Sequence, residues 1–162
     1  MRRAGDIIGL TVIDVASGKK LGQVEDLLFD REGRFLGLCL EQGSWFDRKP
    51  FLPAPFILSI GEDCVTVPGP LPKEEKAVQP QGYWFGRGEP RMQGRPVITV
   101  NGKQLGVLEE VYFDEVQGRI VGYELSDGFV SDLLDGRHII RHPDQFLFGE
   151  DAFVVQQADP GS

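Results

Sequence analysis

Long apolar runs are absent from this sequence. No stretch approaches the roughly 20 apolar residues that a membrane-spanning helix needs. Near the amino end, Asp6 and Asp14 interrupt the apolar residues that follow Arg2 and Arg3, so no signal-peptide core forms. These absences predict a cytoplasmic protein without a transmembrane segment, and they leave open a peripheral association with a membrane complex.

Cysteine and histidine are scarce. Cys39 and Cys64 are the only cysteines, and we expect both to be ordinary small side chains because a cytoplasm is reducing; whether they ever pair stays open. His138 and His142 are the only histidines, with no cysteine nearby in the sequence. A zinc site needs about four ligands. We therefore expect no metal and no cofactor.

Signatures of catalysis are also missing. The sequence contains no Gly-x-Ser-x-Gly elbow, no phosphate-binding loop and no dinucleotide fingerprint. Pairs of acidic residues are plentiful, but they recur beside turn glycines, where turn chemistry and solvated strand faces explain them. We expect no catalytic residue, and an enzyme or small-ligand binder is the least favoured alternative.

Positive charge is in short supply. Seventeen lysines and arginines face 25 acidic residues, which gives a net charge of -8, and no run of basic residues exceeds two. Phosphate backbones repel such a chain, so we do not expect direct binding to nucleic acid.

An internal repeat is the strongest feature that is present. Residues 9–67 align with residues 94–155: Gly-Lys-Lys-Leu-Gly at 18–22 recurs as Gly-Lys-Gln-Leu-Gly at 102–106. Other matched positions are Phe29-Asp30 with Phe113-Asp114, Gly37 with Gly122, and Gly-Glu-Asp at 61–63 with the same triplet at 149–151. Shared turn residues at shared offsets indicate two copies of one unit.

Each copy has the pattern of short strands joined by tight turns, without the spacing of a long helix. Strands are predicted at 12–15, 23–29, 35–40, 107–113, 120–125, 137–140 and 152–155. Simple alternation would direct Leu36, Leu38 and Leu40 inward and Cys39 outward. At Gly37 and Gly122 we expect a bulge or a close approach of backbone. Five or six strands per copy favour a small closed or half-open barrel.

The division into units follows from the repeat. We predict a first unit at 1–69, a proline-rich linker with an aromatic cluster at 70–93, and a second unit at 94–158. Prolines at 68, 70, 72, 80 and 90 give the middle region the composition of a linker.

The order of these motifs, found twice, resembles the PRC-barrel family. The resemblance implies an all-β fold of two tandem six-stranded PRC-type barrels. The family includes the cytoplasmic part of the photosynthetic reaction-centre H subunit and the C-terminal half of a ribosome maturation factor. Those relatives share binding to another macromolecule, and the family offers no catalytic residue to transfer.

Two aromatic clusters have no equivalent in the second copy. They are Trp45 with Phe46, and Tyr83, Trp84 and Phe85. Freed from the packing that both copies share, these side chains either cover a barrel flank or contact a partner, and we take partner binding as the hypothesis.

We therefore predict a non-catalytic interaction or adaptor module that binds a protein partner or a second copy of itself. The alternative is a ribosome- or RNA-processing-associated factor that acts through a protein contact, by family analogy.

Overall fold

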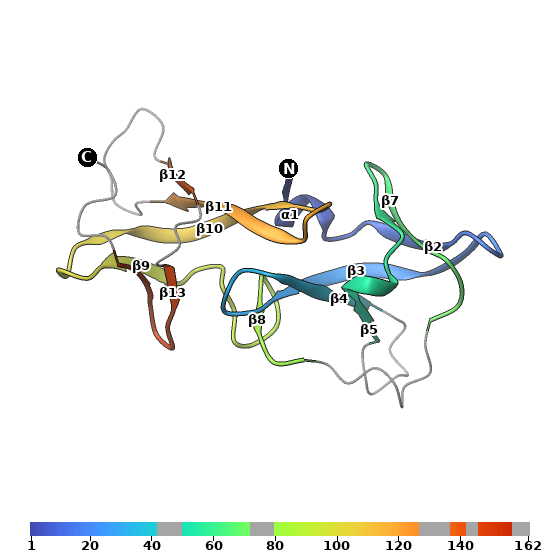
Figure 1. The fold of residues 1–162 in the computed structure, drawn as a ribbon, viewed down its shortest axis with the longest axis horizontal. Coiled ribbons are helices and arrows are strands. Elements are labelled where there is room, and N and C mark those ends of the chain that lie inside the picture. The colour runs from blue at the N-terminus through green and yellow to red at the C-terminus, as the bar shows by residue number, and fades with distance from the viewer. Residues whose placement is uncertain (42–49, 72–79, 127–136, 142–145, 157–162) are drawn as a thin grey trace.

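The computed structural model describes residues 1–41, 50–71, 80–126, 137–141 and 146–156, with the backbone alone for 137–141. These residues form two curled antiparallel-rich sheets that lie along the long axis of the molecule (Figure 1). Strand is the main regular structure, as the sequence predicts.

The two sheets have the same topology. The first runs in the order β5 (Phe51–Pro53), β4 (Phe35–Glu41), β3 (Lys19–Phe29), β2 (Thr11–Asp14), β7 (Cys64–Val67) and β6 (Ser59–Ile60). The second runs β12 (Arg137–Arg141), β11 (Arg119–Ser126), β10 (Gln104–Asp114), β9 (Pro96–Thr99), β14 (Phe153–Val155) and β13 (Phe146–Phe148). Among the described strands of each sheet, one neighbouring pair is parallel: β2 with β7, and β9 with β14. The prediction of two like six-stranded units is confirmed.

One hydrophobic core runs through both units. Its central contact is a trio of rings, Phe29, Phe35 and Phe113, with centroids 5.8, 5.7 and 5.5 Å apart. Phe29 and Phe113 occupy equivalent positions at the ends of β3 and β10, so the repeat brings the two copies together at matching residues.

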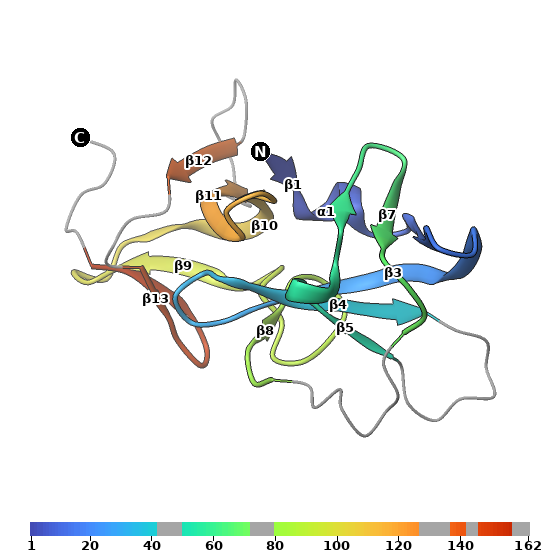
Figure 2. The same cartoon turned by 45° about the vertical axis from the view of Figure 1, so that its right-hand side comes forward.

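Each sheet also receives one short strand from outside its own unit. β1 (Arg2–Arg3) adds to β10 of the second sheet, and the helical turn α1 (Ala4–Ile7) follows it. β8 (Tyr83–Trp84) adds to β3 of the first sheet. Figure 2 places β1 beside the second unit, and both views place β8 beside the first (Figures 1 and 2).

β1 and β8 are equivalent in the repeat. β1 pairs with Tyr112 and Phe113, and β8 pairs with the matching Leu28 and Phe29. The chain after each strand then re-enters its own unit, where Gly9 N–H donates to Val24 O and Gly94 N–H donates to Leu108 O. We call residues 2–10 and 83–95 the leader segments; each begins on the sheet of the other unit. Sheet membership thus crosses the domain bounds predicted from the sequence.

The prediction from simple alternation that Leu36 in β4 points into the main core is wrong. Leu38 and Leu40 are buried in the main core, but Leu36 packs with Cys39 against a separate cluster of Leu28, Phe51 and Trp84. The reason is a bulge in β4 itself. Leu28 and Phe29 are adjacent on β3, but their partners are Gly37 and Phe35, so Leu36 is the extra residue. Such a bulge changes the face to which neighbouring side chains point.

The remaining element of the first unit is a 3-10 turn, η1 (Ala54–Phe56), which leads from β5 to β6. Its C-terminal end is closed by the N–H of Ile57, which donates to Ala54 O at 3.0 Å. This turn lies at the junction with the second unit.

Replacement of Gly37 by alanine is expected to destabilise the fold. An added Cβ would collide with the backbone oxygen of Leu52 and lie 2.6 Å from Cζ of Phe51. We expect Gly37→Ala to lower the free energy of unfolding by about 2 kcal/mol, within the range for overpacking. Gly69→Ala is the control, because a Cβ there meets nothing within 4 Å. Urea unfolding measures both, and equal stability of the two variants would contradict the close approach.

Candidate functional site

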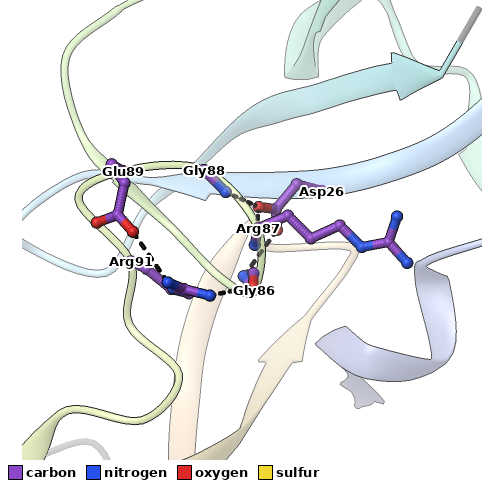
Figure 3. Close-up of polar contacts among 6 residues, drawn as sticks. All are labelled: Asp26, Gly86, Arg87, Gly88, Glu89 and Arg91. Carbon is purple, nitrogen blue, oxygen red and sulfur yellow. Dashed lines mark hydrogen bonds and ion pairs between the residues drawn. The ribbon is translucent and has the colours of Figure 1, made fainter.

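A buried carboxylate joins the second leader segment to the first sheet. Asp26 lies within β3 with 2% of its surface exposed. Its oxygens accept hydrogen bonds from the backbone N–H groups of Gly86, Arg87 and Gly88, at 2.9, 2.5 and 2.8 Å (Figure 3). The N–H of Leu27 donates a further bond at 2.9 Å. Successive backbone N–H groups of this kind form an anion-binding nest, which here holds the chain's own carboxylate.

The loop that forms this nest is fixed by its side chains. Arg91 forms an ion pair with Glu89 at 3.0 Å and donates to the Gly86 carbonyl at 3.5 Å. The guanidinium group of Arg87 extends away from the Asp26 carboxylate (Figure 3). Gly88 lies directly against the Trp84 ring, where a Cβ would collide. This close packing explains the glycine at position 88.

The second unit has an equivalent carboxylate. Glu110 in β10 aligns with Asp26, is 7% exposed, and accepts hydrogen bonds from the N–H groups of Gly5 and Val111 at 2.9 and 3.0 Å. Burial raises the pKa of Glu110 above its ordinary value of 4.5, and the two N–H groups and Arg3 oppose that rise. Arg3 Nε lies 3.8 Å from Glu110 Oε2. Each leader segment is therefore held by a carboxylate of the other unit.

An open groove lies where the two units meet. One wall comes from η1 and the residues after it, and the other comes from the turn between β10 and β11. Its volume is about 760 Å³. The lining residues are Arg34, Phe35, Ala54, Pro55, Ile57, Leu58, Ser59, Ile60, Glu115, Val116, Gln117, Gly118 and Arg119.

Backbone pairing between the units forms the base of this groove. Phe35 N–H donates to Gly118 O at 2.8 Å, and Ile120 N–H donates to Gly33 O at 2.8 Å. Arg34 and Arg119 face each other across an antiparallel bridge. The two bonds are equivalent in the repeat, so the units meet about an approximate twofold axis.

Two large apolar side chains in the groove are exposed. Leu58 is 60% exposed and Val116 is 88% exposed, and they come from different units. Val116 lies in a turn, where Gly, Asn, Asp, Ser and Pro have specific uses and valine has none. The corresponding turn of the first unit carries Arg31 and Glu32. Packing within the fold therefore does not account for Val116.

The aromatic residues predicted to bind a partner are distributed differently. Trp84 and Phe85 are buried, at 7% and 2% exposure, and pack within the chain. Tyr83 is half-buried and donates its hydroxyl to Phe148 O at 3.0 Å, which ties the exchanged strand to β13. Trp45 and Phe46 lie outside the described residues. Of the alternatives that the sequence left open, intrachain packing describes Trp84 and Phe85, and contact of all five with a partner stays a prediction.

The groove residues themselves were not found from the sequence. Leu58, Arg34 and Arg119 belong to turns and strand ends that the topology brings together. One available signal was Val116, because the second copy has an apolar residue where the first has a charged turn. Asp26 and Glu110 also carried a signal, since both are acidic positions in otherwise apolar strands.

Within the described part of the chain, no group of three or more His, Cys, Asp or Glu residues could hold a metal ion. The side chains of His138 and His142 lie outside that part. None of the described helices is long and apolar enough to span a bilayer.

A model of the PRC-barrel domain matches this chain twice, over residues 1–70 and 90–158. The chain belongs to the PRC-barrel family. It is also similar to the uncharacterised protein YrrD of Bacillus subtilis strain 168, with 30% identity over 148 residues that cover 91% of this chain and 82% of YrrD. The tandem PRC-barrel interpretation of the sequence is thus confirmed.

Asp26 is expected to stabilise this PRC-barrel protein through the second leader. Asp26→Asn keeps the shape of the side chain but turns one acceptor into a donor that faces the N–H groups of the nest. We expect a loss of about 2–4 kcal/mol in the free energy of unfolding, because charged hydrogen bonds are replaced by unsatisfied donors. Asp63→Asn, at an exposed position, is the control. A loss below about 0.5 kcal/mol, the surface range, would contradict this role.

Glu110 is expected to make the PRC-barrel fold less stable as pH rises. Because its folded-state pKa is raised above 4.5, its contribution is full below that pH and is lost as pH rises through the folded value. Glu110→Gln keeps an oxygen for Gly5 and Val111 and removes the titration. The stability of the wild type relative to Glu110→Gln should fall above about pH 4.5 in thermal unfolding. Glu62→Gln, at an exposed position, should track the wild type, and a pH-independent difference for Glu110→Gln would contradict the shift.

Proposed function

We propose that this PRC-barrel chain is a non-catalytic protein-interaction module whose partner binds in the groove between the two units. The observation that carries the proposal is the pair of exposed apolar side chains, Leu58 and Val116, which face one groove from different units. Isolated apolar residues on a surface need no explanation, but two in one concave site are typical of interfaces.

Burial of these side chains by a partner would be favourable. Removing apolar surface from water contributes about 25 cal/mol per Å². Neither Leu58 nor Val116 needs to move out of the core to reach a partner. The groove therefore offers binding energy at little cost to the fold.

The chemistry of the lining favours binding over catalysis. Its described residues include one carboxylate, Glu115, and no histidine or cysteine. Glu115 Oε2 lies 3.5 Å from the amino group of Met1, which offsets its charge. A catalytic site needs a nucleophile or an acid–base group with a partner group that activates it, and the described lining side chains form no such pair.

The groove requires both units at once. One wall belongs to the first unit and the other to the second, and the backbone bonds of Phe35 and Ile120 hold them together. A partner in the groove would recognise the tandem arrangement rather than a single barrel. The tandem repeat would thus serve an adaptor, because the two units together form a site that neither unit forms alone.

Site-specific photo-crosslinking in the native cell tests the proposal. A benzophenone amino acid at position 116 should yield a covalent protein adduct, and Leu58→Ser in the same chain should remove most of it. The probe at position 100 is the matched control, because Val100 is also an exposed turn valine, 57% exposed, but does not line the groove.

Equal adducts from positions 100 and 116 would contradict the proposal, as would an adduct at 116 that is insensitive to Leu58→Ser. Thermal unfolding should show that the Leu58→Ser chain remains folded, because that side chain is largely solvated already.

A further inference from the structure

We infer that the groove binds an acidic peptide segment, in which apolar side chains that contact Leu58 and Val116 are flanked by carboxylates that pair with Arg34 and Arg119. The inference rests on the proposed function and adds the chemistry of the partner. It follows from the charge of the groove relative to the rest of the chain.

The groove is locally basic on an acidic protein. The chain carries a net charge of -8, yet the charged residues that line the groove are two arginines and one glutamate. The Met1 amino group lies 3.5 Å from that glutamate. Beside the groove, a third guanidinium group belongs to Arg2, whose Nη1 donates to the carbonyl of Ile60 at 2.9 Å.

The two arginines are placed against each other. Arg34 and Arg119 are directly opposed across the antiparallel bridge, and both are exposed. Like charges directly opposite each other on neighbouring strands are destabilising. Among the ion pairs between described residues, neither arginine takes part. A carboxylate placed between them would relieve this repulsion.

Guanidinium groups are well suited to binding a carboxylate. Their planar donors form paired hydrogen bonds with carboxylates, and an arginine is more weakly hydrated than a lysine. Phosphates bind guanidinium groups equally well, but the negative charge of the chain repels a polyphosphate. A polyphosphate would also make no apolar contact with Leu58 and Val116. A peptide that alternates apolar and acidic residues would satisfy both features of the groove.

Selection from a random peptide library displayed on phage tests the inference, with the full chain immobilised. Peptides of twelve residues enriched on the wild type should contain an excess of Asp and Glu next to apolar residues. Synthetic copies of the enriched peptides are then measured by fluorescence polarisation. The double variant Arg34→Gln with Arg119→Gln should weaken binding by about tenfold or more, because charged hydrogen bonds are lost.

Two further variants separate the inference from the function on which it rests. Leu58→Ser with Val116→Ser removes the apolar contact and should also weaken binding of the same peptides. Arg31→Gln is the matched control, because Arg31 is exposed in the turn of the first unit but does not line the groove, and it should leave affinity unchanged. Urea unfolding verifies that every variant is folded.

The outcomes are distinct. Peptides that depend on Leu58 and Val116, yet show no acidic excess and ignore the arginine variants, overturn the inference and leave the proposed function in place. Failure to select any peptide that depends on Leu58 and Val116 overturns both. Self-association in light scattering that the Leu58→Ser, Val116→Ser variant abolishes overturns the inference in favour of a second copy. Displacement of the peptides by a twelve-nucleotide RNA at physiological salt overturns it in favour of a phosphate ligand.

Discussion

The reciprocal exchange of leader segments is the constraint on which the rest of the structure depends. Each unit is completed by a strand that arrives from elsewhere in the chain, β8 on β3 and β1 on β10. Each exchanged segment is then held by a buried carboxylate of the receiving sheet, Asp26 or Glu110. Units of about 70 residues have a limited core of their own, so sharing one core between two of them increases the buried fraction.

This exchange also determines where the groove lies. The approximate twofold relation that pairs the leaders brings the turns of the two units together, and it places Arg34 opposite Arg119. The equivalent parts of the repeat therefore build the framework, as the matching bonds of Phe35 and Ile120 show. The parts that differ between the copies, Val116 above all, give the groove its exposed apolar surface. The repeated parts form the scaffold, and a turn that differs between the two copies carries an exposed apolar side chain.

Much of the fold could be predicted from the sequence because turns and strands leave local signals. The glycine-containing turns and the alternating strands repeat at fixed offsets, and they predicted both the number and the likeness of the units. The exchange left no such signal. Arg2-Arg3 and Tyr83-Trp84 have no residue in common, because an added strand pairs through its backbone and places few demands on side chains. Prolines nearby made the second leader resemble a linker.

Side-chain direction and the groove were harder to predict for different reasons. Leu36 is on an unexpected face because it is the extra residue of a bulge in β4, and a bulge depends on pairing rather than on local sequence. The groove is formed by residues far apart in the chain, such as Leu58 and Val116, whose proximity requires the tertiary arrangement. Because Trp84 lacks an equivalent in the second copy, its sequence position leaves both intrachain packing and partner contact open. It lies on β8, which pairs with β3, and it packs in the smaller cluster with Leu28 and Phe51, so an unmatched residue can still pack within the chain.

The two leader segments differ in their hydrogen bonds to Asp26 and Glu110, and the first leader also contacts the groove. Asp26 accepts bonds from three N–H groups of its leader, whereas Glu110 accepts one from its own, at Gly5. Glu110 is also the carboxylate whose ionisation burial opposes. The first leader thus gives fewer N–H bonds to its carboxylate than the second leader does. That same leader carries Arg2, which bonds Ile60 beside the groove, and Met1, which offsets Glu115 within it. The first leader thus adds to the positive charge that Arg34 and Arg119 give the groove, so the exchange that completes the second sheet also contributes to the electrostatics of the proposed binding site.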